Sequence, residues 1–244
     1  NLSTAVDYGT EGATSLTVTN TYNQPKVSTA FSVKKTVNGA DGKSGVEGFD
    51  PEETYNFELT PAKENPDAPM PTEDSGKTVS VANGKTGTFG QITYKEAGKT
   101  YEYNITEKAG STPGMTYDTN PHKVTVKVSE TYPLTATVKY DTDQDSLTVN
   151  NQYNGLTVKV SKRALKGEEA FALAGAKLQL LNADDQEKPV KEWTSGEAPE
   201  EIEGLIPGKT YILREISAPD GYTVAEDTQF ILNWDGTLAE KTTT

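Results

Sequence analysis

The stretch Phe31-Ser32-Val33-Lys34-Lys35-Thr36-Val37 decides the fold, because apolar and polar side chains alternate along most of it. A period of two indicates a β-strand with one buried and one solvated face. The same alternation recurs in six further segments: 55–59, 123–128, 134–140, 147–153, 156–162 and 211–215. Turn signals such as Asn83-Gly84, Pro219-Asp220-Gly221 and Trp234-Asp235-Gly236 fall between such runs. Only residues 164–174 have fair helix propensity, which an internal glycine weakens. We therefore expect an all-β protein built from β-sandwiches.

A repeat sets the domain boundaries. The segment Leu16-Thr17-Val18-Thr19-Asn20-Thr21-Tyr22 recurs as Leu147-Thr148-Val149-Asn150-Asn151-Gln152-Tyr153, which closes a unit that begins near Ser28. We expect residues 1–26 to be the closing strands of a preceding, truncated domain or a donated strand. A full domain then occupies residues 27–154, and a second domain, without its last strand, occupies residues 155–244. Tandem β modules of this kind are typical of stalks.

Composition excludes several classes of function. The chain has no cysteine and one histidine, so it has no thiolate metal ligand and too few histidines for a multi-histidine metal site. We expect no metal and no cofactor. With 23 Lys and Arg against 36 Asp and Glu, the net charge of −13 disfavours nucleic acid and anionic membranes as partners. No apolar run approaches the ~18 residues of a membrane helix, so we expect no membrane insertion of this segment.

Three polar residues fall on the buried faces of the predicted strands. Lys35 shares its face with Phe31, Glu107 follows the alternation of residues 101–107, and Asn151 shares its face with Leu147. An unpaired charge costs several kcal/mol or more when it is buried, so the three groups must compensate one another.

Two arrangements provide this compensation. One is an ordinary buried ion pair between Lys35 and Glu107, with Asn151 hydrogen-bonded nearby. The other is covalent: the neutral lysine amine attacks the Asn151 carboxamide, while Glu107 polarises the carbonyl and passes a proton to the departing ammonia. The second domain repeats the lysine and the glutamate as Lys162 and Glu215 on predicted inward faces. This repetition favours the covalent arrangement.

The second domain offers no acceptor after Trp234-Asp235-Gly236. The strand at residues 16–22 is an alternative source, because it places Asn20 on the same face as Val18 and Tyr22. It could complete the second domain within the chain or from a neighbour, since edge strands accept added strands. Asn20 is therefore a candidate acceptor for Lys162.

The full domain resembles the isopeptide-linked pilin domains of Gram-positive bacteria, of the streptococcal major-pilin type. The matching segments are 31–37, 100–107, 113–118 and 147–153. The second domain resembles the Cna B-type module, and residues 211–222 match the pilin "E box". The resemblance implies tandem immunoglobulin-like β-sandwiches with spontaneous Lys–Asn or Lys–Asp amide bonds. It assigns Lys35, Glu107 and Asn151 to the first site and Lys162 and Glu215 to the second.

We therefore expect a structural stalk or shaft segment of a Gram-positive pilin or adhesin, with other pilin or surface-protein subunits as partners. It is expected outside the cell on a wall-anchored fibre, although no Leu-Pro-any-Thr-Gly sorting signal is present in this sequence. Glu107 and Glu215 would act once each, so the chain would not be a turnover enzyme. The alternative function is a ligand-binding adhesin module that recognises a host glycan or matrix protein.

Overall fold

The computed structural model describes residues 2–7, 17–39, 53–141 and 143–243. Within these residues the regular structure is β-strand, apart from one 3-10 turn, η1 (Asp74–Lys77), which confirms the predicted all-β class. The chain divides into two compact units. One comprises residues 1–35, 54–108 and 119–149, and the other comprises residues 36–53, 109–118 and 150–244. Within the described part of the chain, no helix has the length and apolar character that crossing a membrane demands.

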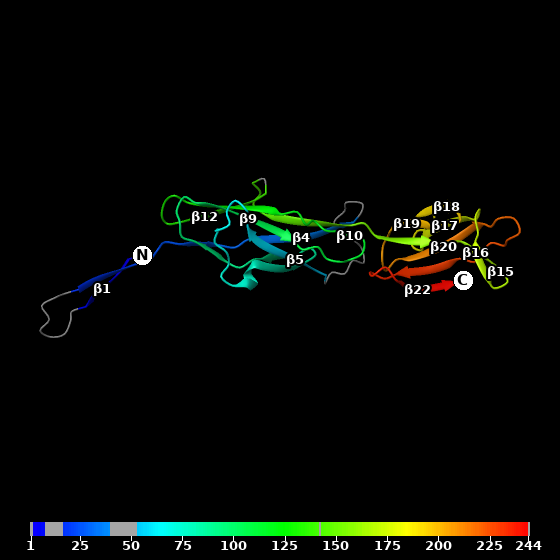
Figure 1. The fold of residues 1–244 in the computed structure, drawn as a ribbon, viewed down its shortest axis with the longest axis horizontal. Coiled ribbons are helices and arrows are strands. Elements are labelled where there is room, and N and C mark those ends of the chain that lie inside the picture. The colour runs from blue at the N-terminus through cyan, green and yellow to red at the C-terminus, as the bar shows by residue number, and fades with distance from the viewer. Residues whose placement is uncertain (1, 8–16, 40–52, 142, 244) are drawn as a thin grey trace. The chain divides into compact units, whose positions relative to one another are not determined.

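An antiparallel five-stranded sheet lies within the first unit (Figure 1). Its central strand, β9, pairs with β11 on one side and with β5 on the other. In spatial order the strands are β12 (Ala136–Tyr140), β11 (His122–Val128), β9 (Thr100–Glu107), β5 (Thr54–Pro61) and β6 (Thr78–Ala82). Tyr103, Ile105 and Glu107 are buried, as the alternation predicts for one face of β9.

A four-stranded sheet contains the strand that opens the predicted domain and the strand that closes it. In spatial order it consists of β10 (Met115–Thr116), β13 (Leu147–Tyr153), β4 (Ser32–Gly39) and β7 (Thr86–Thr88). A smaller pair is formed by β3 (Val27–Thr29) and β8 (Ile92–Tyr94). The side chains of Phe31 and Tyr103 meet with ring centroids 5.1 Å apart, so residues next to β4 and on β9 share one core.

The N-terminal strands form a sheet of their own. β1 (Leu2–Asp7) pairs antiparallel with β2 (Thr17–Tyr22), and Asn20 lies opposite Thr4. Among the described residues, neither strand pairs with any other. Leu16, which belongs to the predicted strand, lies outside the described residues.

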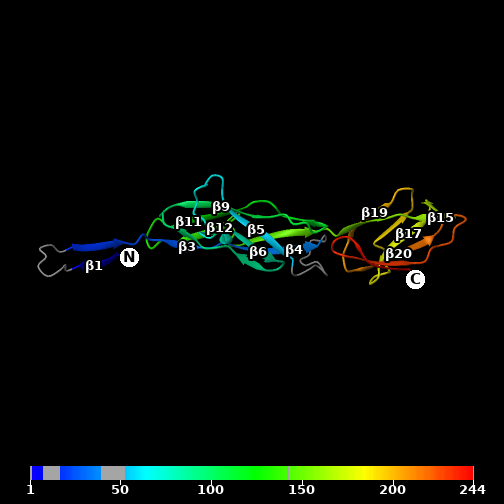
Figure 2. The ribbon, with the colours of Figure 1, turned by 60° about the horizontal axis from the view of Figure 1, so that its bottom comes forward.

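Residues 156–243 form two facing layers of sheet. One layer has the order β18 (Lys191–Thr194), β17 (Lys177–Asn182), β20 (Thr210–Ser217), β21 (Thr228–Leu232) and β22 (Leu238–Thr243). The other is the pair β14 (Leu156–Val160) and β19 (Glu200–Leu205), and Figure 2 shows β19 apart from β20. Leu156, Ile202 and Leu205 from the second layer pack with Leu180 and Phe230 from the first, which makes a sandwich core.

Two elements differ from the sequence-based expectation. The stretch of fair helix propensity is a hairpin, β15 (Arg163–Lys166) and β16 (Glu169–Ala172). Gly167 has φ +65°, a left-handed conformation that a helix does not allow and a two-residue turn requires. The second difference is the strand β22, which was not predicted because Leu238 is its one large apolar residue and the segment has no apolar alternation. In the structure Leu238 is exposed. β22 pairs with β21 and not with β14.

Candidate functional site

A buried ion pair joins the two sheets that contain β4 and β9. Lys35 Nζ lies 2.7 Å from Glu107 Oε2, and both side chains are 0% exposed. Lys35 occupies the inward face of β4 between Val33 and Val37, and Glu107 ends β9 opposite Phe57 of β5. The structure therefore brings together two of the three residues predicted for the first site.

The backbone around Lys35 is held by the turn that follows β6. The Lys35 N–H donates to the Lys85 carbonyl and the Lys35 carbonyl accepts from the Gly84 N–H, both at 2.9 Å. Gly84 has φ +76°, the conformation that the Asn83-Gly84 turn signal predicted. These bonds fix the register of β4, and with it the face on which Lys35 lies.

An aromatic ring completes the environment of the amine. Lys35 Nζ lies 4.8 Å from the centroid of the Tyr55 ring, a distance at which a cation is attracted to the ring face. Tyr55 is 2% exposed and belongs to the inward face of β5, next along the alternation from Phe57. Tyr55 was not singled out from the sequence, although the period-two pattern of residues 55–59 already placed it inward.

The predicted acceptor, Asn151, lies on β13, the strand beside β4 in the four-stranded sheet. Its side chain is fully buried, and its Oδ1 accepts a hydrogen bond of 2.9 Å from the Asp118 N–H. A donor on the carbonyl oxygen withdraws electron density from the carboxamide carbon, as donors in an oxyanion hole do. Asp118 lies in the predicted 113–118 segment, but no sequence signal identified its N–H as a donor.

The second lysine–glutamate pair has the same geometry in a less buried setting. Lys162 Nζ lies 2.8 Å from Glu215 Oε2, and their side chains are 17% and 2% exposed. Lys162 lies just after β14, where its carbonyl accepts a 3.0 Å hydrogen bond from the Leu173 N–H at the end of the β15–β16 hairpin. The structure thus brings together the two residues predicted for the second site.

A backbone donor holds Glu215 as well. The Ala225 N–H donates to Glu215 Oε2 at 2.7 Å. The segment that contains Ala225 is tied to β20 by a bidentate ion pair in which Arg214 Nη2 lies 2.7 Å from Asp227 Oδ2. Neither Ala225 nor this ion pair was identified from the sequence. Asn20, the candidate acceptor for Lys162, lies on β2, which shares a sheet with β1 alone among the described strands.

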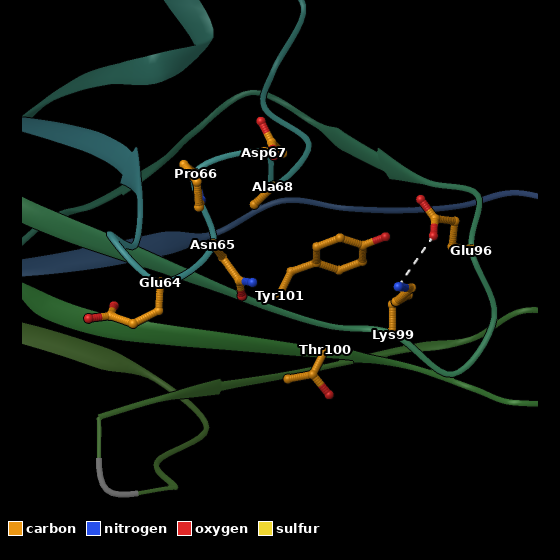
Figure 3. Close-up of a pocket in the computed structure, with 9 residues that line it drawn as sticks. All are labelled: Glu64, Asn65, Pro66, Asp67, Ala68, Glu96, Lys99, Thr100 and Tyr101. Atoms are coloured by element: carbon orange, nitrogen blue, oxygen red, sulfur yellow. Dashed lines mark ion pairs between the residues drawn. The ribbon is translucent and has the colours of Figure 1, made fainter.

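A surface hollow of about 360 Å³ lies within the first unit, apart from these residues (Figure 3). The Tyr101 ring lies at its centre, and Lys99 forms an ion pair with Glu96 at 3.7 Å on one side. Burial and the negative charge of Glu96 raise the pKa of Tyr101. None of the predicted site residues lines this hollow. Among the described residues, no cluster of three or more histidine, cysteine, aspartate or glutamate side chains could hold a metal ion.

Comparison with protein families gives two matches. Residues 31–154 match FctA, described as the Spy0128-like isopeptide containing domain, and residues 156–244 match SpaA, described as a prealbumin-like fold domain. A search of curated proteins gives no match.

Three of the similar solved structures come from different bacteria. The major pilin protein T-13 of Streptococcus pyogenes is 17% identical, with 91% of this chain and 95% of that chain covered and a TM-score of 0.42. The C-terminal fragment of the pilus adhesin SpaC of Lactobacillus rhamnosus GG is 14% identical, with 87% and 86% covered and a TM-score of 0.37. The Bacillus anthracis TIE protein is 15% identical, with 97% and 39% covered and a TM-score of 0.44.

Proposed function

Because the chain belongs to the FctA family of Spy0128-like isopeptide containing domains, we propose that it is a shaft segment of a Gram-positive surface fibre, locked by a Lys35–Asn151 amide bond. The family match covers residues 31–154, and the prealbumin-like match covers residues 156–244. The predicted resemblance to pilin-type domains is thereby confirmed. The two matches also support the domains proposed from the sequence, at residues 27–154 and 155–244.

The observation that carries the proposal is the Lys35–Glu107 pair. A lysine with 0% exposure that contacts a carboxylate with 0% exposure is costly as an ion pair, because burial penalises both charges. Moving one proton from Nζ to Oε2 across 2.7 Å removes both charges at once. The resulting free amine is a nucleophile, and Asn151 lies on the neighbouring strand.

The proposed reaction balances without a cofactor. The neutral Lys35 amine attacks Cγ of Asn151, while the protonated Glu107 donates to the carbonyl oxygen. The Cγ–Nδ2 bond then breaks and the amide nitrogen leaves as ammonia, with the lysine proton relayed through Glu107. One N–C bond replaces another and no electrons are transferred to an oxidant. The site reacts once, so the chain is not a turnover enzyme.

An amide bond between Lys35 and Asn151 would suit a shaft segment. It would join the strand that opens the domain, β4, to the strand that closes it, β13, and so enclose nearly the whole domain in one covalent loop. Such a loop limits extension under force and removes entropy from the unfolded chain, as a disulfide does. We propose that the chain acts outside the cell, as part of a fibre in which other pilin or surface-protein subunits are its partners.

Intact mass under denaturing conditions tests the proposal. We expect the monomeric fraction of the wild-type chain to weigh one ammonia less than its sequence, and a digest to contain residues 35 and 151 in one linked peptide. Lys35→Arg keeps a positive charge beside Glu107 but cannot form the bond, so its mass should match its sequence. Lys34→Arg changes the exposed neighbour on the other face and should leave the linked peptide intact. A wild-type chain at full mass would overturn the proposal.

A further inference from the structure

The two reactive-lysine strands differ in the number of their neighbours. β4 has β13 on one side and β7 on the other. β14 has β19 on one side, and in the part of the chain that the structure describes no strand lies on its other side. The backbone N–H and C=O groups along an unpaired strand edge are a template for another strand.

The open edge leaves the inward residues of β14 incompletely covered. Val33, Lys35 and Val37 of β4 are all 1% exposed or less. Val158 and Val160 of β14 are only half-buried, although they pack against the core of the second domain. A strand added to this edge would bury their remaining apolar surface, which is a favourable change.

The carboxylate at this site also lacks one partner. Glu215 is 6% exposed, and its Oε2 already accepts from Lys162 and from the Ala225 N–H. Its other oxygen, Oε1, is buried and has no hydrogen-bond partner. A buried oxygen without a hydrogen-bond partner is unfavourable, so the site favours a ligand that brings an N–H or O–H donor. A carboxamide side chain supplies such a donor next to an electrophilic carbon.

We propose that the open edge of β14 receives β2 of a second copy of this chain, and that Lys162 forms an amide bond with Asn20 of that copy. The inference rests on the Lys–Asn chemistry of the proposed function, but it concerns a different lysine and a bond between molecules. It makes residues 17–22 of one chain the neighbour of β14 in the second domain of another.

The sequence identifies β2 as the occupant. Beside β4, the neighbouring strand β13 reads Leu147-Thr148-Val149-Asn150-Asn151-Gln152-Tyr153. The segment Leu16-Thr17-Val18-Thr19-Asn20-Thr21-Tyr22 repeats its apolar positions, its asparagine and its tyrosine in the same order. Among the described strands β2 pairs with β1 alone, so its second edge is available.

The short linker before β3 restricts the movement of β2 within its own chain. Residues 23–26 alone separate β2 from β3, which is paired with β8 in the first unit. Four residues span at most about 14 Å, so this linker tethers β2 to its own β3. A strand from another molecule is free of that tether. Because the donor and the receiver are different surfaces, the contact is head-to-tail and can repeat into a fibre.

The chemical step is the same as in the first domain. Proton transfer from Lys162 to Glu215 leaves a neutral amine, which attacks Cγ of Asn20. The new Nζ–Cγ bond replaces the Cγ–Nδ2 bond, and ammonia leaves with the proton that Glu215 returns. Each link therefore removes one ammonia from a pair of chains.

A complementation experiment with the 244-residue chain tests this proposal. Lys162→Arg retains a cation for Glu215 but cannot form the amide, and Asn20→Thr retains strand propensity but has no carboxamide. Each variant alone should remain a monomer on a denaturing gel. Mixed together, they should form a covalent dimer and nothing longer, because one bond consumes the only Lys162 and the only Asn20 in the pair. Salt of about 0.15 M screens the repulsion between chains of charge −13.

Matched controls change neighbouring residues of the same type. Lys159→Arg on β14 and Asn23→Thr after β2 should both leave the ladder of covalent multimers that we expect for the wild-type chain. A digest of the multimers should contain Lys162 linked to Asn20. Absence of covalent multimers in the wild-type chain would overturn the proposal, and so would a monomer with a Lys162–Asn20 link within one chain. The Lys35–Asn151 peptide in the same digest reports the first bond separately, so failure of either proposal is visible on its own.

Discussion

Asn151→Ala isolates the stabilisation that the proposed Lys35–Asn151 cross-link would provide, because the Lys35–Glu107 ion pair stays in place. The proposed bond would close a loop of more than about 100 residues, which is worth about 5 kcal/mol of unfolding free energy in the chain-entropy model. The variant also loses the acceptor of the Asp118 N–H, a hydrogen bond of 2.9 Å worth about 1 kcal/mol. Unfolding entropy of about 2.1 cal/mol/K per residue then predicts that the Tm of the first domain falls by about 20 °C.

Differential scanning calorimetry measures this change, and the neighbouring asparagine supplies the control. Asn150 accepts a hydrogen bond from Thr36 at 3.1 Å, so Asn150→Ala should cost about 1 kcal/mol, or roughly 4 °C, without loss of the cross-link. Intact mass shows which variant retains the bond. The reasoning would be refuted if Asn151→Ala melted within a few degrees of Asn150→Ala, or if both variants had lost the same mass relative to their sequences.

Three further changes probe other parts of the structure. Glu107→Gln removes the proton relay, so the monomeric chain should keep its full mass, and a digest with residues 35 and 151 in one linked peptide would show that another group serves as the acid. Burial raises the pKa of Tyr103 and of Tyr153 to about 12, above the value of 10.0 for an exposed tyrosine. Their contribution to the free energy of unfolding is therefore complete below pH 10 and falls by about 2 kcal/mol for each residue as the pH rises through 12. Urea melts from pH 9 to 12 measure this fall, and a free energy of unfolding that does not change with pH would contradict it. Gly114→Ala should destabilise the domain by about 2 kcal/mol or more in the same urea assay, because φ is +78° and the added Cβ would lie 2.3 Å from the Gly155 carbonyl oxygen; a loss below about 0.5 kcal/mol would be too small for this backbone clash.

Much of the fold and part of the site could be predicted because alternation fixes which face a residue occupies. Lys35, Glu107 and Asn151 each continue an apolar period of two, and all three are buried in the structure. Alternation also explains why Glu215 is buried while Ile216, its neighbour, is half exposed. Which side chains of a strand are buried depends on the alternation within that strand, and this alternation can be read directly from the local sequence.

Contacts made by the backbone could not be predicted in the same way. The Asp118 and Ala225 N–H groups that hold Asn151 and Glu215 belong to irregular segments, where residue type says nothing about the direction of an N–H. The β15–β16 hairpin was missed for a related reason. Helix propensity over 11 residues is a weak preference, and the left-handed Gly167 with the pairing of two short strands outweighs it.

Which strand lies next to a lysine that we propose to be reactive is a separate question from the face on which that lysine lies. Lys35 and Lys162 both contact a glutamate, at 2.7 Å and 2.8 Å, so the ion pairs alone do not distinguish them. What differs is the lateral neighbour, since β4 is flanked by two strands and β14 by one among the described residues. The sequence contains information about such a neighbour only through the repeated strand pattern that ends in Tyr22 and Tyr153. The repeat corresponds to β13, which lies beside β4, and to β2, which we propose lies beside β14 of another chain; in both strands the proposed acceptor is the asparagine two residues before the tyrosine.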